Sequence, residues 1–583
     1  MTRAVVLLSE FTPKSLTSMN DDIDLQSTRV ATIQTRLNCD LEDAELADHA
    51  SPMAANLNRR AVLRALGTLM AGAGVVPAAL ASAQDDTATP VATPSQPISD
   101  ELIRAFIADL EAAQQTYDVT GVSVALVQDD RVVLSRGFGT RDLERRLPVT
   151  EHTRFRIASN TKSMTSFLVA TFVDEGVLDW DDRVIDLWPD FRAPTPELTA
   201  TLRVRDLLGM GTGIAESPTV EFFMSGGDES PLELLQSVAY LPVIGPPQSV
   251  YFYNNTLVCL AGYLAPLAQG NAPEGLVETY ASLLQERLFD PAGMVDSIIA
   301  SDPRPLGEDF AIGYRHDLFG RTMAVPFISI DGVAPAGSGL ASSSDMASYL
   351  IMQMQGGVAS DGARLVSEAN LAETHAPGIV VPPDVANALP SLVLADTLET
   401  RYCLGWFEQT FKDGRRLLWH AGGIDGFVSL MGFFPDEKIG FVLLTNSESG
   451  GGLFTISVQS SLLNRLFGLN QTVPDILAGL LPESEQYVAD LVAQTRPVDA
   501  TAARPYLGLY EQGFQLRLDE AGGLYLDHDI RTMPLLALAE GGYVVTSGPS
   551  MILGRKITFT GDAATQLTMS IEGFDPVRWL TAS

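Results

Sequence analysis

The spacing of apolar and polar residues after residue 97 predicts helices first, then a hairpin, then helices again. Apolar positions recur every three to four residues from Ser99 to Thr116, which predicts a helix with Ser99 as its N-cap. Two β-rich runs around Asp129–Asp130 predict a hairpin. A second helix is predicted from Ser163 to Glu175, ending at Gly176. Its apolar side consists of Met164, Phe167, Leu168, Thr171 and Phe172.

Short helices and Pro/Gly-rich loops are predicted between about residues 180 and 400, and strands return from Leu417 to Asn446. Helices at the start, a helical middle and late strands are typical of an α+β fold. We therefore expect residues 98–470 to form one domain, with an antiparallel sheet flanked by helices and a helical subdomain.

The C-terminal part has a different pattern. Residues 475–495 predict a connecting helix with Asp475 as its N-cap, inside a connector that spans 471–503. From 504 to 583 short strands alternate with turns that contain Gly and Asp, which predicts a separate small all-β barrel of about eight strands. Within it, Asp527 and His528 are interpreted as a solvated turn pair rather than a catalytic pair.

The first 97 residues read as targeting and linking sequence. Residues 53–83 predict a twin-arginine signal peptide, with Arg59 and Arg60 before an uncharged Ala/Gly-rich stretch that ends in Ala81-Ser82-Ala83. A transmembrane anchor is the alternative, but the stretch is poor in Leu, Ile and Phe. Residues 84–97 form a Thr/Pro/Ala linker.

Residues 1–52 show no hydrophobic pattern, so they are predicted to be a non-structural extension upstream of a start at Met53. An unusually long cytoplasmic segment before the signal is the alternative. We expect an exported bacterial protein, periplasmic, in the cell envelope or extracellular, with no stable membrane insertion after the signal is cleaved.

Charge and composition exclude several classes of function. The net charge of −34 over 583 residues argues against nucleic acid as a partner, because a phosphate binder needs a basic face. Three cysteines make neither a disulfide framework nor a metal-ligand pattern, and six histidines lack the spacing of a zinc hydrolase. We expect no metal and no cofactor, and a small molecule or short peptide as substrate.

Lys162 is the first candidate for catalysis. The chain has few lysines, and from Ser15 to Phe411 Lys162 is the only one, three residues after Ser159. Arginine cannot release its proton near neutral pH, whereas a buried lysine can. Ser-x-x-Lys at the start of a helix places an amine beside a hydroxyl, which can make the serine nucleophilic. The alternative is a capping serine with a surface lysine.

Two further segments offer groups for acid–base and oxyanion chemistry. Tyr253 can shuttle a proton, and Asn255 can orient the lysine or the substrate. Further along, His420 ends a predicted strand and precedes the small residues Gly422 and Gly423. Small residues let a substrate lie against a strand edge, and Gly423 could supply an oxyanion N–H. A packed tyrosine and a structural histidine are the alternatives.

Together, Ser-x-x-Lys, Tyr-x-Asn and His-x-Gly in this order resemble the serine β-lactamase-like superfamily. The similar branch holds class C β-lactamases, D-Ala-D-Ala carboxypeptidases, D-aminopeptidases and related esterases. Residues 98–470 carry the resemblance, and the tail resembles the lipocalin-like β-domains appended to such hydrolases. Further segments agree with the family: Phe155–Ser159, Val204–Gly213, Leu288–Met294, Ala336–Ser342 and Tyr402–Trp406.

The resemblance implies a covalent acyl-enzyme on Ser159, with Lys162 and Tyr253 moving protons. It also implies that Ser159 and Gly423 hold the oxyanion, that Asn255 positions Lys162 and the substrate, and that His420 assists deacylation.

Two positions depart from the family. Met210 stands where histidine is frequent, and His420 stands where β-lactamases mostly carry a carboxylate-binding lysine. Neutral imidazole attracts a carboxylate less well, so esters or amides are the expected substrates. The alternatives are a D-amino-acid peptidase or β-lactamase, and a sensor that is acylated without turnover.

Overall fold

The computed structural model describes residues 97–216, 230–383, 396–471, 473–528, 531–549, 552–561, 567–572, 574 and 576–581. The predicted signal peptide and upstream extension lie outside these residues, as does nearly all of the linker.

The larger domain is built on a nine-stranded sheet in the order β3-β2-β1-β14-β13-β12-β11-β10-β9, with every neighbouring pair antiparallel. The predicted hairpin is confirmed as β1 and β2, and β1 pairs with the late strand β14. The N-terminal hairpin thus completes a sheet formed from residues about 300 positions later. The strands are β1 Gly121–Gln128, β2 Arg131–Asp142, β3 Leu147–Pro148, β9 Ile379–Val380, β10 Thr397–Tyr402, β11 Phe407–Phe411, β12 Arg416–Ile424, β13 Phe427–Phe434 and β14 Ile439–Thr445.

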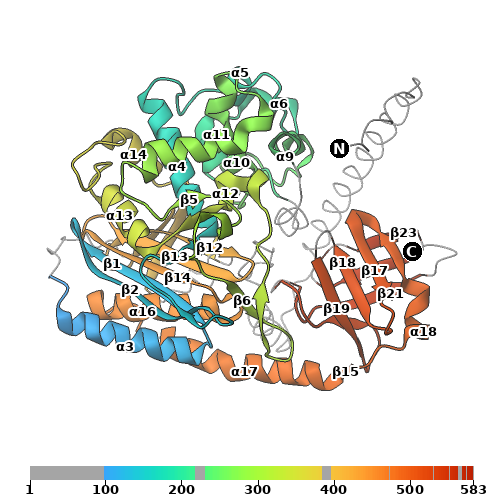
Figure 1. Ribbon diagram of the computed structural model, residues 1–583. Helices are drawn as coiled ribbons and strands as arrows, with labels where there is room; N and C mark the ends of the chain where they lie inside the picture. Colours follow the sequence, from blue (N-terminus) through green and yellow to red (C-terminus); the bar gives the residue numbers. More distant parts are fainter. Residues whose placement is uncertain are drawn as a thin grey trace, which may run out of the picture. The chain divides into compact units, whose positions relative to one another are not determined.

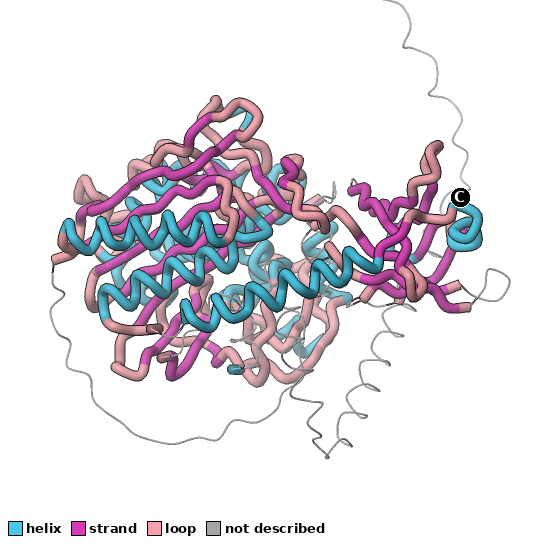
Figure 2. Tube along the Cα trace, turned by 90° about the horizontal axis from the view of Figure 1, so that it is seen from below, coloured by secondary structure: helices cyan, strands magenta, loops and turns pink. Residues whose placement is uncertain are grey.

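Helices cover both faces of this sheet (Figure 1). On one face lie α3 (Asp100–Thr116), with the predicted Ser99 cap on Leu102 N, and α16 (Glu448–Phe467). These two helices run side by side (Figure 2), and Arg465 donates to Asp109 across them at 2.6 Å. The other face carries α4 (Thr161–Asp174) and α13 (Ser343–Met354). The predicted antiparallel sheet flanked by helices is confirmed.

The predicted helical subdomain is formed around α10, with two small sheets beside it. Its elements and those that connect it to the large sheet are α5 Val184–Leu187, α6 Pro196–Thr201, α7 Val204–Leu208, α9 Pro231–Ser237, α10 Asn255–Ala268, α11 Leu276–Leu284, α12 Ala334–Gly337, α14 Glu368–Thr374, β4 Phe155–Arg156, β5 Ile298–Ile299, β6 Gly313–His316, β7 Thr322–Val325 and β8 Gly339–Ala341.

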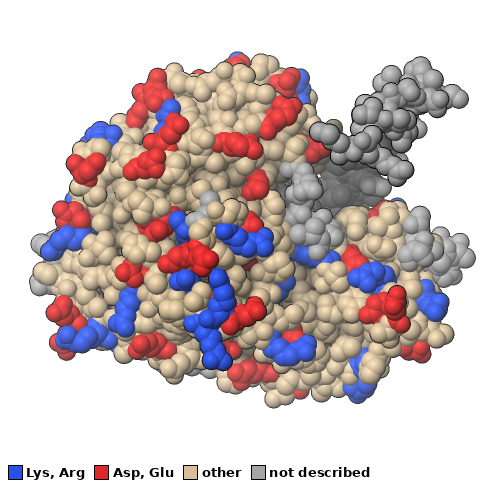
Figure 3. Space-filling view, viewed as in Figure 1, with Lys and Arg blue, Asp and Glu red and all other residues tan. Residues whose placement is uncertain are grey.

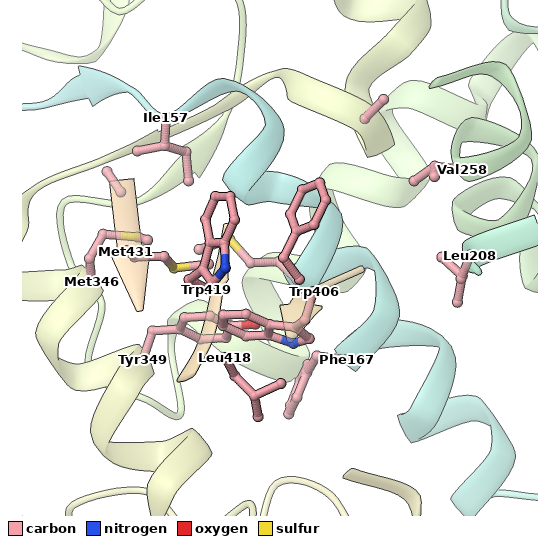
Figure 4. Packing of buried hydrophobic residues seen from close by; sticks show 14 of the residues in the cluster. Ile157, Phe167, Leu208, Val258, Met346, Tyr349, Trp406, Leu418, Trp419 and Met431 are labelled. Carbon is pink, nitrogen blue, oxygen red and sulfur yellow. The ribbon is translucent and has the colours of Figure 1, made fainter. Parts of the chain in front are cut away.

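Helix α4 is the centre of the core. It is buried on every side from Thr161 to Phe172, not on one apolar side as its sequence pattern predicted. Most of its polar side chains tolerate burial because they are hydrogen-bonded: Ser163 donates to Asn160 O at 2.9 Å, whereas the Ser166 hydroxyl has no partner. Around it pack large aromatic residues (Figure 4). Trp406 and Tyr349 lie almost parallel, with ring centroids 6.2 Å apart.

The C-terminal domain is a closed barrel with its own apolar core, as predicted. Eight antiparallel strands run in the order β19-β18-β17-β16-β23-β22-β21-β20, and pairing of β20 with β19 closes the ring. The strands are β16 Gly508–Tyr510, β17 Phe514–Leu518, β18 Leu524–His528, β19 Arg531–Leu538, β20 Tyr543–Val545, β21 Lys556–Thr560, β22 Thr568–Ile571 and β23 Val577–Thr581. A short strand, β15 (Thr495–Arg496), adds to the edge of β19.

Two expectations for this region are wrong. The connecting helix α17 spans Val473–Gln494, so Asp475 lies inside it and not at its N-cap. Pro474 is tolerated there because the first helical turn needs no backbone N–H partner. Asp527 and His528 lie in strand β18, not in a turn. Asp527 pairs with Arg517, and His528 is buried with Nε2 2.8 Å from Gln512 O.

Acidic and basic side chains are interspersed over the face shown in Figure 3. Among the helices that the structure describes, none combines the length and apolar character that a membrane crossing requires.

Candidate active site

Ser159 lies on a tight turn ahead of α4. The turn is a 3₁₀ segment, Ala158–Asn160, and Ala158 adopts φ +46°, a left-handed conformation that costs a non-glycine residue energy. Such strain persists only where the surroundings enforce it. Ser159 is partly exposed although its neighbours on both sides are buried, so the turn presents its hydroxyl at the edge of the core.

A hydrogen-bonded clamp holds this turn against strands β12 and β13. The Ser429 hydroxyl donates to Ile157 O at 2.7 Å and accepts from Asn160 Nδ2 at 2.7 Å. Gly422 allows the close approach, since a Cβ there would lie 2.2 Å from Ile157 O. The clamp therefore fixes the nucleophile relative to the strand that carries His420 and Gly423.

Lys162 is fully buried, and its amine faces the nucleophile. Its Nζ lies 3.0 Å from Ser159 Oγ and donates to Ala336 O at 2.8 Å. The ring of Tyr253 lies over the same amine, with 4.8 Å between Nζ and the ring centroid. An amine at hydrogen-bonding distance from a hydroxyl can take its proton. The predicted grouping of these three side chains is what the structure shows.

The segment that carries Tyr253 is fixed from both sides. Asn254 caps α10 by accepting from Leu257 N at 2.9 Å, and its own N–H points at Met210 Sδ, 3.1 Å away. Met210 occupies the position at which the resembling family often has histidine. Its buried sulfur contacts the backbone next to Tyr253. Asn255 is the first residue of α10, and its amide nitrogen donates to Glu216 at 3.1 Å.

Glu216 is a candidate site residue that the sequence motifs did not reveal. It lies 39 positions before Asn255 in no recognisable motif. An acidic residue such as Glu216 can stabilise the positive N-terminal end of a helix. The sequence alone does not show which helix it would contact.

His420 is buried at 1% exposure and uses both ring nitrogens. Nδ1 lies 2.7 Å from Ala421 O, and Nε2 lies 3.1 Å from the Tyr402 hydroxyl. A carbonyl oxygen only accepts, so the hydrogen is on Nδ1 and Tyr402 donates to Nε2. Burial lowers the pKa of His420 to about 3, and the positive charge of Lys162, when it is protonated, acts in the same direction. The ring is therefore neutral, and the hypothesis that it helps activate water gains no support from this geometry.

Tyr402 is a second residue without a role in the sequence analysis. Burial raises the pKa of its phenol, so it remains a hydrogen-bond donor to His420. Its ring also packs edge-on against Tyr253, with centroids 6.2 Å apart. Tyr402 therefore connects His420 to the tyrosine above the lysine.

Gly422 and Gly423 lie inside β12, not after its end as expected. They pair with Ser429 and Val428 of β13, and the chain turns only at Asp425–Gly426. The strand thus continues past His420 beside the Ser159 turn, with backbone groups at its surface and no side chains at the glycines.

The structure also bears on alternative nucleophiles and on metals. Cys259 and Cys403 are buried, and burial raises the pKa of the Cys403 thiol to about 12 and that of Cys259 further. Neither is a reactive thiolate. In the described part of the chain, no three His, Cys, Asp or Glu side chains are grouped as metal ligands would be.

Comparisons with known proteins agree with the fold. The Beta-lactamase family profile matches residues 102–456. A curated relative, Unguisins hydrolase ungD of Aspergillus violaceofuscus, is 25% identical over 72% of this chain and 77% of its own length. Penicillin-binding protein 4 of Amycolatopsis lactamdurans is 25% identical over 69% of this chain and 96% of its own. The octameric penicillin-binding protein homologue from Pyrococcus abyssi superposes with a TM-score of 0.54 at 23% identity, covering 82% of this chain and 99% of that structure.

Proposed function

The chain belongs to the Beta-lactamase family, whose members are serine hydrolases, and from that premise we propose an exported hydrolase that forms an acyl-enzyme on Ser159. The observation that carries this proposal is the Ser159–Lys162 pair. The serine is partly exposed, the lysine is fully buried, and 3.0 Å separates Oγ from Nζ.

Acylation begins when Ser159 Oγ attacks the substrate carbonyl and its proton passes to Lys162 Nζ. The tetrahedral intermediate then collapses, the bond to the leaving group breaks, and the leaving group takes the proton of the Tyr253 hydroxyl, which leaves a phenolate beside the protonated Lys162. The donor bond from Nζ to Ala336 O supports this role, because it keeps the amine aimed at Oγ.

The negative charge on the intermediate needs donors in fixed positions. We assign the backbone N–H of Ser159, on the turn before α4, and the backbone N–H of Gly423, on β12. The Ser429 clamp supports this pairing, since it ties the turn to the same pair of strands.

Deacylation requires a base for the attacking water. We assign it to Tyr253, whose ring packs on Lys162, and we give His420 a positioning role through Tyr402. Water adds to the acyl carbon while its proton passes to the Tyr253 phenolate, the bond to Ser159 Oγ breaks, and Oγ takes back the proton that Lys162 has held since acylation.

The expected substrates are esters or amides rather than carboxylate-bearing β-lactams, because neutral His420 replaces a cationic lysine. A peptidase or β-lactamase is the second candidate, favoured by the relatives named as an unguisins hydrolase and a penicillin-binding protein. A sensor acylated without turnover is the third candidate. It would give one stoichiometric burst with a chromogenic ester, whereas a hydrolase turns over repeatedly.

The test is paired substitution at the nucleophile. Ser159→Ala and Lys162→Arg should each lower ester hydrolysis by about three orders of magnitude, because the two groups act as a unit and guanidinium cannot act as a base. A serine-reactive phosphonate should give one adduct, on Ser159, by mass spectrometry. An active Ser159→Ala variant, or an adduct on another residue, would contradict the proposal.

A further inference from the structure

Thr165 joins helix α4 to the short helix α12, which carries the acceptor of the Lys162 amine. It follows Lys162 by three residues, so the two side chains lie on neighbouring turns of one face of α4. The buried Thr165 hydroxyl lies 2.6 Å from Pro335 O and 2.7 Å from the Tyr280 hydroxyl. The next carbonyl, Ala336 O, accepts from Lys162 Nζ at 2.8 Å. Thr165 thus contacts the residue directly before the one that aims the lysine.

The direction of these hydrogen bonds follows from the groups that make them. A threonine hydroxyl has one hydrogen, and backbone carbonyls only accept. Two carbonyls compete for this hydrogen: Pro335 O at 2.6 Å, and Thr161 O in the same helix at 3.3 Å. A bond to the carbonyl four residues earlier is open to any threonine inside a helix. Here the shorter bond leaves the helix, so the hydrogen goes to Pro335 O and Tyr280 donates to the Thr165 oxygen.

Tyr280, on α11, is placed to keep the Thr165 hydrogen in this direction. Its side chain is fully buried, and its ring packs edge-on against Tyr263 with centroids 6.0 Å apart. Burial raises the pKa of the Tyr280 phenol, so the phenol stays protonated and remains a donor. While Tyr280 donates to the Thr165 oxygen, the hydrogen of Thr165 points away from Tyr280 and toward a carbonyl.

Pro335 is held from a second side as well. A Cβ on Gly262 of α10 would lie 2.5 Å from Pro335 Cβ, so the glycine lets α10 pack directly against the proline ring. Peptide groups are planar, and each residue has only two soft backbone torsions. The torsions of Ala336 are therefore all that separates the carbonyl bonded by Thr165 from the carbonyl that accepts from Lys162. Fixing Pro335 O limits how far Ala336 O can move.

We propose that Thr165 and Tyr280 are positioning residues for the reaction at Ser159, because together they fix the backbone carbonyl that aims the Lys162 amine. The inference rests on the proposed function, which gives Lys162 the proton of Ser159. In this role neither side chain contacts the substrate. Loss of either hydroxyl should slow the attack by Ser159 and leave the affinity for the substrate unchanged.

The experiment measures the reaction of Ser159 with a p-nitrophenyl phosphonate ester. Oγ bonds to phosphorus, its proton passes to Lys162, and the bond to p-nitrophenolate breaks, which gives a coloured product. The maximal rate at saturating phosphonate reports the attack, and the concentration for half of that rate reports binding. Thr165→Val keeps the shape and removes the hydroxyl. It should lower the maximal rate by about ten- to a hundredfold, since a displacement of about 1 Å at a reacting group can cost a hundredfold.

Tyr280→Phe tests the second residue of the pair. Without the phenol, the Thr165 hydrogen can turn to Thr161 O, but the hydroxyl itself remains. The maximal rate should fall by about three- to tenfold, the value of one neutral hydrogen bond. The double variant should be no slower than Thr165→Val, because both residues act along one path. Tyr280→Phe decides the question if Thr165→Val does not fold.

Two further variants separate positioning from general damage. Thr165→Ser keeps the hydroxyl and should react at nearly the wild-type rate. Thr171→Val is the matched control, the same substitution later in α4. The buried Thr171 hydroxyl donates to Leu168 O at 2.7 Å and accepts from Arg287 at 3.3 Å. Its loss should lower the melting temperature about as much as Thr165→Val does, while the maximal rate stays at the wild-type value.

Equal maximal rates in wild type, Thr165→Val and Tyr280→Phe would overturn the inference. A rate that falls in Thr171→Val as much as in Thr165→Val would also overturn it, since any damage to α4 would then suffice. So would weaker binding of the phosphonate with an unchanged maximal rate. In each of these cases modification of Ser159 in wild type leaves the proposed function standing. A wild type that is not modified on Ser159 overturns both proposals.

Discussion

We expect the position of the nucleophile to depend on Ser429, a side chain with no chemical role. Ser429 is 1% exposed and joins Ile157 O to Asn160 Nδ2. Ser429→Ala leaves both groups buried without this partner, and each such loss costs about 1–3 kcal/mol. Ile157 O still accepts from the Asn160 backbone N–H at 3.2 Å and from Asn160 Nδ2 at 3.3 Å, so neither group is left unsatisfied and the total should be about 1–2 kcal/mol.

The effect on catalysis should exceed what lost stability explains. Without the clamp the strained turn at Ala158 can relax, and a displacement of about 1 Å at a reacting atom can cost about a hundredfold in rate. We therefore expect kcat for a p-nitrophenyl ester to fall by about ten- to a hundredfold under conditions where Ser429→Ala remains folded.

Ser123→Ala is the matched control for this experiment. Ser123 is also fully buried in the sheet, on β1, and bonds two partners: Ser343 Oγ at 2.7 Å and Thr150 O at 3.2 Å. Its loss should lower the free energy of unfolding in urea to a similar extent while kcat stays near wild type. The clamp argument fails if both variants lose stability equally and Ser429→Ala keeps its full kcat.

Three further predictions concern substrate choice, pH and export. His420→Lys should raise the relative affinity for carboxylate-bearing substrates, and efficient nitrocefin turnover by wild type would contradict the reasoning from His420. Burial lowers the pKa of both His375 and His420 to about 3, from an ordinary 6.5. Their contribution to stability is thus complete above pH 6.5 and lost as the pH falls toward 3, because the unfolded chain takes up the protons first. Urea titrations should show a steeper loss over that range in wild type than in His375→Gln. A chain beginning at Met53 should be exported and cleaved near Ala83, and joint Arg59→Lys and Arg60→Lys should block export; a mature N-terminus before Met53 would contradict this.

The features predicted most accurately are those formed by residues close together in the sequence. Ser99 caps α3 and the hairpin turns at Asp129–Asp130, because capping and turn formation depend on residues within a few positions. Ser159 and Lys162 face one another for the same reason, being three residues apart on a helical turn. The eight strands of the barrel also follow from local alternation.

Contacts between distant segments could not be predicted. The acceptor that aims Lys162 is the carbonyl of Ala336, 174 positions away, and a carbonyl carries no sequence signal. The burial of α4 on all sides depends on aromatic residues such as Trp406 that lie far from α4 in the sequence. The neutral state of His420 could not be predicted for the same reason. The buried surroundings of the ring, and not its residue type, decide whether it is charged.

We expect the groups around Lys162 to act together on substrate choice. In the usual family arrangement a second cation on the strand would attract a carboxylate, but here the strand carries a histidine held neutral by burial and by Tyr402. At the start of α10, the buried Glu216 carboxylate accepts from the Asn255 side-chain amide. We therefore expect an anionic substrate group to meet no cation at the position of His420 on the strand. We expect these groups to suit a neutral acyl substrate better than one that carries a carboxylate.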